Sequence, residues 1–220
     1  MKKISTKILD KAIWLSTPNT CFDKTDFERE ERLIYYKKSK PNNRGTSGSF
    51  FSKKCSKLIK YESHLEYDFL IKLEVSSNVI DFGSQPLKIS YRGHTRNYYP
   101  DFYYMLNNKA IVLGEIKPVG EMGYFYNWMK WKAMKKYCYR NGMGLLITNG
   151  KTTITDLNRP IANIDFKSDL MQLFDCKKEL EWVEVYDLKV KHNATMRDLT
   201  CIVIQEKLHW YRGPSKLVKV

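Results

Sequence analysis

The chain has 220 residues, 43% of them hydrophobic, and a formal net charge of +14 at pH 7. This length accommodates one large domain or a medium domain with a small one, and the hydrophobic content excludes a mainly disordered chain. No apolar run is long enough to span a membrane, and charges interrupt the apolar residues of the N-terminus. We therefore expect a cytoplasmic protein, neither secreted nor in a membrane.

The positive charge is the strongest compositional signal. A charge of this size predicts a polyanionic partner, nucleic acid before a membrane surface, because no long basic amphipathic helix stands out. The alternative is that the basic residues only aid solubility. The five cysteines are scattered, with no CxxC motif or Cys/His cluster. This spacing indicates neither a zinc site nor a disulfide framework.

The N-terminal part predicts a basic extension over residues 1–44, followed by a first domain over residues 45–155. Pro, Asn, Gly and Ser between basic residues at 37–54 are typical of a loop, which lies along a phosphate backbone or is simply solvated. A helix is predicted within 61–75, because apolar residues recur there every four positions. Ser63 with Glu66 three residues later forms a capping box for it.

The middle of the chain alternates strands and helices. The predicted elements are a strand at 79–91 broken near Gly83 and Pro86, two strands around Asn107-Asn108, a basic helix at 124–142 and a buried strand at 144–148. Asn tolerates a positive φ, so a tight hairpin turn is expected between the two strands. Gly142 ends the basic helix. This order predicts an α/β fold, a mixed sheet flanked by helices.

Residues 160–220 have a different pattern. Helices are predicted near 165–174 and 193–208, the second capped by Asn193 or Thr195, followed by a hairpin that turns at Gly213-Pro214. This order predicts a small winged-helix-like unit that binds DNA or a partner. We expect it to be basic and separable from the first domain. The alternative is a C-terminal extension packed on that domain.

The hairpin around Asn107-Asn108 gathers charged residues. Glu115 and Lys117 lie two positions apart on one strand, so their side chains point to the same face. The tight turn brings Asp101 beside Glu115, within roughly 5–8 Å. Two neighbouring carboxylates repel each other unless something neutralises them, and Mg²⁺ suits a site with one or two carboxylates. We therefore predict an ion between Asp101 and Glu115 that also binds the carbonyl of Ile116.

The alternative interpretation of these charges is a surface salt bridge, which would contribute little. Against it, the strand "AIVLGEI" is otherwise apolar and therefore predicted to be central in the sheet. Charges at the end of a central strand favour a functional site. The ion would lower the pKa of a bound water, and Lys117 would orient that water and contact the scissile phosphate.

These motifs resemble the TnsA endonucleases of heteromeric transposons, within the PD-(D/E)xK nuclease superfamily. That family carries a Ser-x-Lys stretch, a YES-x-LE helix, a Q-P strand, a PDF motif and an (E/Q)-x-K-P motif, in this order. The corresponding positions here are Ser52-Lys53-Lys54, Tyr61–Glu66, Gln85-Pro86, Pro100-Asp101-Phe102 and Glu115–Pro118. The resemblance covers roughly residues 45–150 and implies a restriction-endonuclease-like fold.

The resemblance also implies a function. It implies a Mg²⁺-dependent DNA endonuclease, with Mn²⁺ as a substitute, that nicks the 5′ strands at transposon ends. A DDE-type transposase similar to TnsB would cut the 3′ strands, and an AAA+ regulator similar to TnsC would bind the C-terminal region. The setting would be the nucleoid of a bacterium or a phage-associated element. The implied catalytic residues are Glu66, Asp101, Glu115 and Lys117.

Other residues have two interpretations each. Glu62 and Gln85 support the site or make structural contacts. The tyrosines from Tyr98 to Tyr104 pack in the core or stack on bases. His64 and His94 are isolated and are not expected to bind metal. Lysines and an arginine near the site contact DNA phosphate or form a solvated face. They are Lys53, Lys54, Lys130, Lys132, Lys135, Lys136 and Arg140.

Two other functions stay open. The first is a free-standing nuclease of the same fold, such as a restriction or phage DNA-processing enzyme. The second is a catalytically silent DNA-binding assembly module. The full set of Glu66, Asp101, Glu115 and Lys117 argues against the second, because decay of an active site usually removes at least one member.

Overall fold

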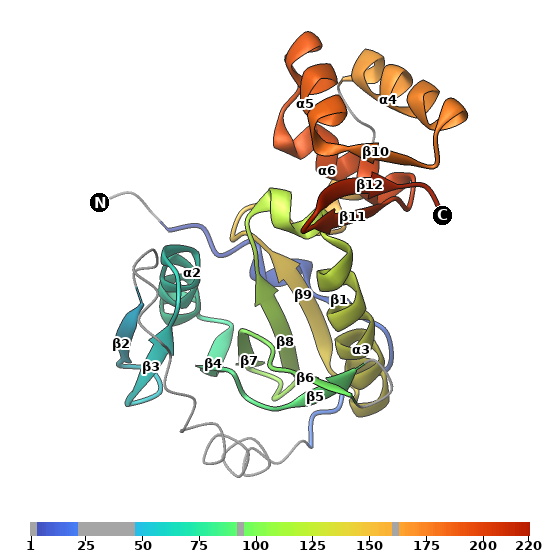
Figure 1. Ribbon diagram of the computed structural model, residues 1–220. Helices are drawn as coiled ribbons and strands as arrows, with labels where there is room; N and C mark the ends of the chain where they lie inside the picture. Colours follow the sequence, from blue (N-terminus) through green and yellow to red (C-terminus); the bar gives the residue numbers. More distant parts are fainter. Residues whose placement is uncertain (1–3, 22–46, 92–94, 160–162) are drawn as a thin grey trace. The chain divides into compact units, whose positions relative to one another are not determined.

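The computed structural model describes residues 4–21, 47–91, 95–159 and 163–220. The chain forms two compact units, the first made of Met1–Ile116 with Lys130–Lys151 and the second of Lys117–Met129 with Thr152–Val220 (Figure 1). No described helix combines the length and the apolar character that crossing a membrane requires. Assignment of residues 45–155 to a nuclease domain and of 160–220 to a DNA- or partner-binding unit stays a prediction.

A five-stranded mixed sheet organises the first unit, as the sequence predicted. Antiparallel pairing joins every neighbouring pair of strands except β8 and β9, which are parallel. A parallel pair needs a long crossover, and α3 (Phe125–Asn141) lies in the connection between these two strands. The order across the sheet is β1 (Ile13–Trp14), β9 (Gly144–Thr148), β8 (Ile111–Ile116), β7 (Phe102–Leu106) and β4 (Val79–Ser84).

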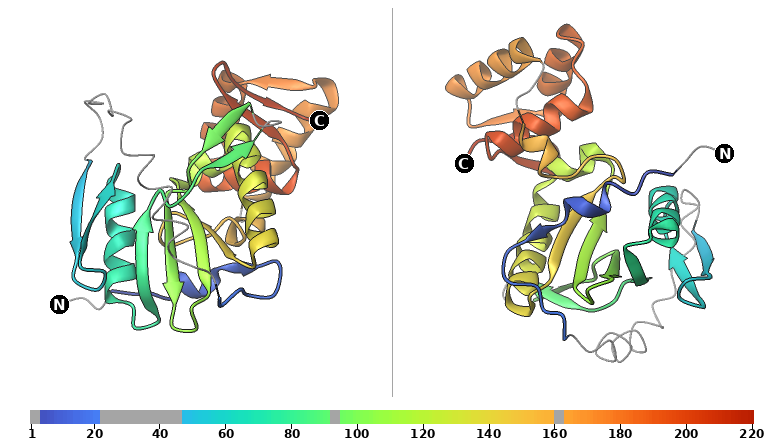
Figure 2. Two further views of the ribbon diagram at one scale, coloured as in Figure 1. Left: turned by 90° about the horizontal axis from the view of Figure 1, so that it is seen from below. Right: turned by 180° about the vertical axis from the view of Figure 1, so that it is seen from behind.

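The two faces of this sheet carry different side chains because strand residues alternate. Helix α2 (His64–Val75) and the segment around η1 (Leu9–Lys11) belong to the core on one face. There the ring of Phe69 lies 4.4 Å from that of Phe102, centroid to centroid. The other face meets the part of α3 that belongs to this unit, with Met134 fully buried (Figure 2). Two short hairpins complete the unit: β2 (Gly48–Ser52) with β3 (Lys57–Tyr61), and β5 (Ile89–Tyr91) with β6 (Arg96–Tyr98).

Helix α2 begins after Ser63, the cap that the sequence predicted, but the Glu66 side chain reaches back to the backbone N–H of Glu62 and the structure does not assign the predicted capping box. The Ser63 side chain accepts a hydrogen bond from the backbone N–H of Glu66, which satisfies one of the free donors of the first turn. Gly142 follows α3 with a φ of 64°, so this glycine ends the basic helix as expected.

The turn between β7 and β8 differs from the expected one. The positive φ belongs to Lys109, at 65°, and not to either asparagine. The Asn108 side chain instead accepts a hydrogen bond from the backbone N–H of Ala110, and the Asn107 backbone N–H bonds to the carbonyl of Asn78. The Asn108 side chain is therefore an acceptor within the turn, and the residue with the left-handed conformation is the next one, Lys109. The predicted hairpin is present, and its turn covers residues 107–110.

The second unit combines a small antiparallel sheet with helices. Two of its elements, β10 and α5, were not predicted, although Val185 of α5 is buried and Trp182 and Leu188, three positions to either side, pack in the same core. Thr195 caps α6, one of the two candidates from the sequence. The helices are α4 (Ile164–Cys176), α5 (Trp182–Lys191) and α6 (Met196–Gln205), and the sheet order is β10 (Glu179–Glu181), β12 (Ser215–Val218), β11 (His209–Arg212).

The charge of the C-terminal part corrects another expectation. Residues 160–220 contain ten lysines and arginines against nine aspartates and glutamates, a net charge of +1. The prediction of a basic C-terminal unit is therefore wrong. The whole second unit has twelve basic and eleven acidic residues, so +13 of the total charge of +14 belongs to the first unit.

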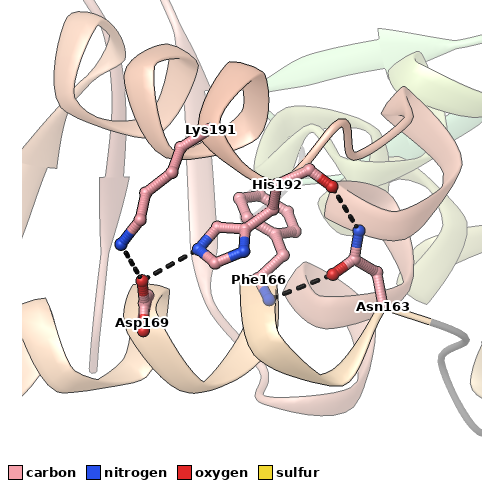
Figure 3. Close-up of polar contacts among 5 residues, drawn as sticks. All are labelled: Asn163, Phe166, Asp169, Lys191 and His192. Atoms are coloured by element: carbon pink, nitrogen blue, oxygen red, sulfur yellow. Dashed lines mark hydrogen bonds and ion pairs between the residues drawn. The ribbon is translucent and has the colours of Figure 1, made fainter.

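A small polar network joins α4 to the end of α5 (Figure 3). The Asn163 side chain accepts a hydrogen bond from the backbone N–H of Phe166 at 3.1 Å and donates one to the carbonyl of His192 at 3.0 Å. Asp169 accepts from Lys191 at 2.7 Å and lies 2.8 Å from the His192 ring nitrogen. One side chain thus caps two helix ends, and a carboxylate lies between the same helices.

We expect Asn163→Ala to destabilise this unit. It removes an N-cap bond and the partner of the His192 carbonyl, a loss of about 1–2 kcal/mol. Hydrogen exchange measured by mass spectrometry should be faster than in the wild type over 163–192 and unchanged over 111–116. Ser168→Ala, at an exposed position of the same helix, is the control and should leave exchange unchanged. Equal protection in both variants would contradict the capping role.

The Asp169 contacts predict a pH dependence. Hydrogen bonds from Lys191 and then His192 hold the pKa of Asp169 below its usual value. A carboxylate with a lowered folded-state pKa stabilises the fold above its unfolded pKa of about 3.9 and loses this effect as the pH falls further. Urea midpoints should therefore be lower for Asp169→Asn than for the wild type at pH 7, and this difference should shrink towards pH 3. A difference that stays constant with pH would exclude a role for the Asp169 charge.

Candidate active site

Asp101 lies directly before β7. The pairing of Phe102 with Gly114 sets Asp101 across from Glu115, one step beyond the last paired residues. Its Oδ2 accepts a hydrogen bond from the backbone N–H of Ile116 at 2.8 Å. The carboxylate is therefore fixed to the last residue of β8.

Glu115 is buried in the central strand, with 1% of its surface exposed. Its Oε2 accepts a hydrogen bond of 2.5 Å from the hydroxyl of Tyr98. The same hydroxyl lies 3.5 Å from the sulfur of Met134 in α3. A buried carboxylate is costly unless hydrogen bonds compensate it, and Tyr98 supplies one.

Tyr98 was not predicted as a site residue. Packing was one of two interpretations of the tyrosines, and the burial of Tyr98, Tyr103 and Tyr104 confirms it. The hydroxyl of Tyr103 bonds to Asp81 and that of Tyr104 to the carbonyl of Leu9, each at 2.8 Å. The rule that a buried carboxylate needs a donor points to a tyrosine near Asp101, but the sequence does not choose between Tyr98 and Tyr99.

Burial and neighbouring negative charge both act on the Tyr98 hydroxyl. Burial, and then the negative charges of Glu115 and Asp101, raise the pKa of Tyr98 well above its usual value. The hydroxyl therefore stays protonated and acts as a donor. The ammonium of Lys130 lies 5.6 Å from the centre of the Tyr98 ring, within the range of a cation–π contact.

A small pocket of about 10 Å³, room for about one water molecule, opens beside Asp101. Glu66 from α2 and Ile116 from the end of β8 line it together with Asp101. Lys60 of β3 also lines it and was not predicted, because nothing in the sequence shows that the β2–β3 hairpin reaches this point. The structure thus brings Glu66 and Asp101 into one pocket, whereas the Glu115 carboxylate is held by Tyr98.

The Glu66 side chain makes contacts at the N-terminus of α2 and also lines the pocket. Its carboxylate accepts hydrogen bonds from the Ser63 hydroxyl at 3.0 Å and from the backbone N–H of Glu62 at 2.8 Å. The same side chain lines the pocket. Its role at the helix N-terminus therefore holds it next to Asp101.

Glu62 and Gln85 both contact this region. The Gln85 side chain donates to Glu62 Oε1 at 3.3 Å, and the Gln85 backbone N–H donates to the carbonyl of Asp101 at 3.1 Å. Gln85 has a positive φ of 45°. These bonds give both residues a structural part in holding the Asp101 segment.

Lys117 directly follows β8 in the chain and is the first residue of the second unit. Its projection beside Glu115 stays a prediction. His64 is exposed at the first position of α2, and His94 lies outside the described residues. Much of the basic extension 1–44 and of the loop 37–54 also lies outside them.

The remaining basic candidates differ from one another. Lys54 donates to the carbonyls of Leu73 and Ser76, so its ammonium caps the end of α2. Its predicted DNA contact is not favoured by this geometry. Lys53 is exposed. Helix α3 carries five basic residues and no acidic one, and four of these are exposed. They are Lys132, Lys135, Lys136 and Arg140.

The donor set suits a hard divalent cation. Within the described ranges, no three or more His, Cys, Asp or Glu side chains are grouped so that they could hold a metal. Asp101 and Glu115 therefore offer at most a pair of carboxylates at the end of β8. Mg²⁺ is bound by one or two carboxylates together with water and phosphate oxygens, so these residues fit it.

Comparison with models of protein families gives a match to part of the chain. The family model described as TnsA-like endonuclease N terminal matches residues 76–149. This segment contains Gln85, Asp101, Glu115 and Lys117, and it ends before the second unit continues at Thr152. No curated protein sequence matches the chain. The family match confirms that the segment with the β7–β8 hairpin and α3 resembles the N-terminal part of the TnsA-like endonucleases.

Proposed function

We propose that the protein is a metal-dependent DNA endonuclease that resembles TnsA and cuts the 5′ strands at the ends of a transposon. A DDE-type transposase similar to TnsB would cut the other strands. The observation that carries this proposal is the fixed position of Asp101 across from the buried Glu115, within the segment that matches the family.

Each residue of the site is assigned a different role. Asp101, Glu115 and the carbonyl of Ile116 would hold the ion, Mg²⁺ or Mn²⁺. When bound, the metal lowers the pKa of a water molecule and stabilises charge on the phosphate. Lys117 is assigned to orient the attacking water and to contact the scissile phosphate. Glu66 lines the pocket beside Asp101 and is assigned to bind the same water network.

The charge distribution supports assigning DNA binding to the first unit. That unit has a net charge of +13, and α3 presents Lys132, Lys135, Lys136 and Arg140 to solvent without a neighbouring acid on the helix. Phosphate groups bind such rows of lysine and arginine and release counterions. DNA would therefore contact α3 as well as the catalytic residues.

The second unit is assigned to a protein partner. Its order of helix, strand, two helices and two strands, with four residues between α5 and α6, supports a winged-helix-like fold. The second helix of such a pair reads DNA, yet residues 199–203 of α6 are all buried and the unit is nearly neutral. We infer that this unit binds an AAA+ regulator similar to TnsC and not DNA.

We expect Asp101→Ala to lower Mg²⁺- or Mn²⁺-dependent nicking of plasmid DNA by at least about 100-fold. The change removes a metal ligand and leaves the sheet intact, which circular dichroism should verify. Asp68→Ala, at an exposed position of α2, is the matched control and should keep wild-type activity. Equal activity in the two variants would exclude Asp101 from the site.

A second measurement on Asp101→Ala separates the proposed function from a free-standing nuclease. With the partner transposase present, the 3′ strands would still be cut and joined, while the 5′ strands stay attached to the donor DNA. Replication would then give cointegrates in place of simple insertions. Simple insertions at wild-type frequency would rule out this chain as the 5′-strand nuclease, and the other nuclease functions would then take its place.

The role of α3 predicts a change in the salt dependence of DNA binding. Lys135→Gln with Lys136→Gln should lower affinity and reduce the slope of log K against log salt by up to about 2, because each phosphate contact contributes about 0.9. Lys178→Gln with Lys207→Gln changes the same charge at exposed positions of the second unit and should change neither quantity. Fluorescence anisotropy at several salt concentrations measures both. The same slope in both double variants would contradict DNA binding by α3.

A further inference from the structure

We propose that Tyr98 is a positioning residue of the nuclease site, because its buried hydroxyl holds the Glu115 carboxylate in the orientation that metal binding requires. The inference rests on the proposed function. It assigns a role to a residue outside the PD and ExK motifs, on a strand that does not belong to the main sheet.

The hydroxyl of Tyr98 is itself held in place. Tyr98 ends β6, where it pairs with Ile89 of β5, and only 5% of its surface is exposed. Its hydroxyl lies between Glu115 Oε2 at 2.5 Å and the sulfur of Met134 at 3.5 Å. A small second sheet and α3 therefore fix the donor from two sides, and the donor in turn fixes the carboxylate.

Glu115 depends on such a partner. Its side chain has three rotatable bonds, and the strand backbone alone does not choose among their rotamers. A hydrogen bond from a rigid donor selects one orientation, as the second partner of a metal ligand commonly does. Displacement of a catalytic group by about 1 Å can lower a rate by about 100-fold. Loss of the hydroxyl should therefore weaken metal binding although Glu115 itself is unchanged.

The packing role of Tyr98 is separable from this bond. Tyr98→Phe keeps the ring, its burial and its contact with Lys130 and removes only the hydroxyl. Tyr104→Phe is the matched control, because Tyr104 is fully buried in the same unit and donates to a backbone carbonyl, that of Leu9, and not to a carboxylate. A purely structural role of the hydroxyl would give the two variants similar properties.

The experiment measures Mn²⁺ binding to the full chain by electron paramagnetic resonance, and plasmid nicking across a range of Mn²⁺ concentrations. We expect Tyr98→Phe to bind Mn²⁺ about tenfold more weakly and to recover much of its nicking activity at high Mn²⁺. Tyr104→Phe should bind Mn²⁺ as the wild type does, and urea midpoints should show both variants folded.

Three outcomes would overturn the proposal. Wild-type Mn²⁺ affinity in Tyr98→Phe, with the wild type and Asp101→Ala behaving as expected, would exclude Tyr98 alone and leave the proposed function standing. The same loss of affinity in both tyrosine variants would show a structural role only. A wild-type chain that neither binds Mn²⁺ nor cuts DNA would remove the proposed function and this inference with it.

Discussion

The hydrogen bond from the backbone N–H of Ile116 to the carboxylate of Asp101 is the constraint on which the site depends. It joins the residue before β7 to the last residue of β8, so the position of Asp101 follows from the pairing of these strands. Glu115, adjacent in the chain, is then set across from Asp101 without any loop between them. A site built on paired strands keeps its geometry better than one built on loops.

The close spacing of the strands restricts which residue can occupy position 114 of β8. Gly114 lies beneath the ring of Phe102, where an added Cβ would approach the ring carbon Cζ to 2.0 Å and the carbonyl of Leu146 to 2.7 Å. The close approach of the three strands therefore requires glycine beside Glu115. Glu115 points to the opposite face of the strand, where it is buried and the hydroxyl of Tyr98 replaces part of the solvation that it loses.

Local signals predicted the parts of the site that local chemistry decides. Ser63 and Glu66 predicted the start of α2, Gly142 the end of α3, and the apolar run before Glu115 a central strand. The sequence could not show which hydroxyl meets Glu115 or that Lys60 reaches the pocket, because β6 and β3 come close through tertiary packing. Nor could the sequence show that the Lys54 ammonium binds the carbonyls of Leu73 and Ser76 at the end of α2. Helix α5 was not predicted although Trp182, Val185 and Leu188 recur every three positions and pack in the core of the second unit.

The two units differ in net charge as well as being packed separately. Nearly all of the net charge belongs to the unit with the carboxylates, and the other unit, with its buried α6, is close to neutral. Under the proposed function, long-range attraction would bring DNA to the basic unit at rates that depend on salt. A neutral unit would add little to that attraction, but it also would not compete for DNA with the proposed nuclease unit. Binding of a protein partner to the neutral unit would then be compatible with DNA held by the basic one, as the proposed function requires.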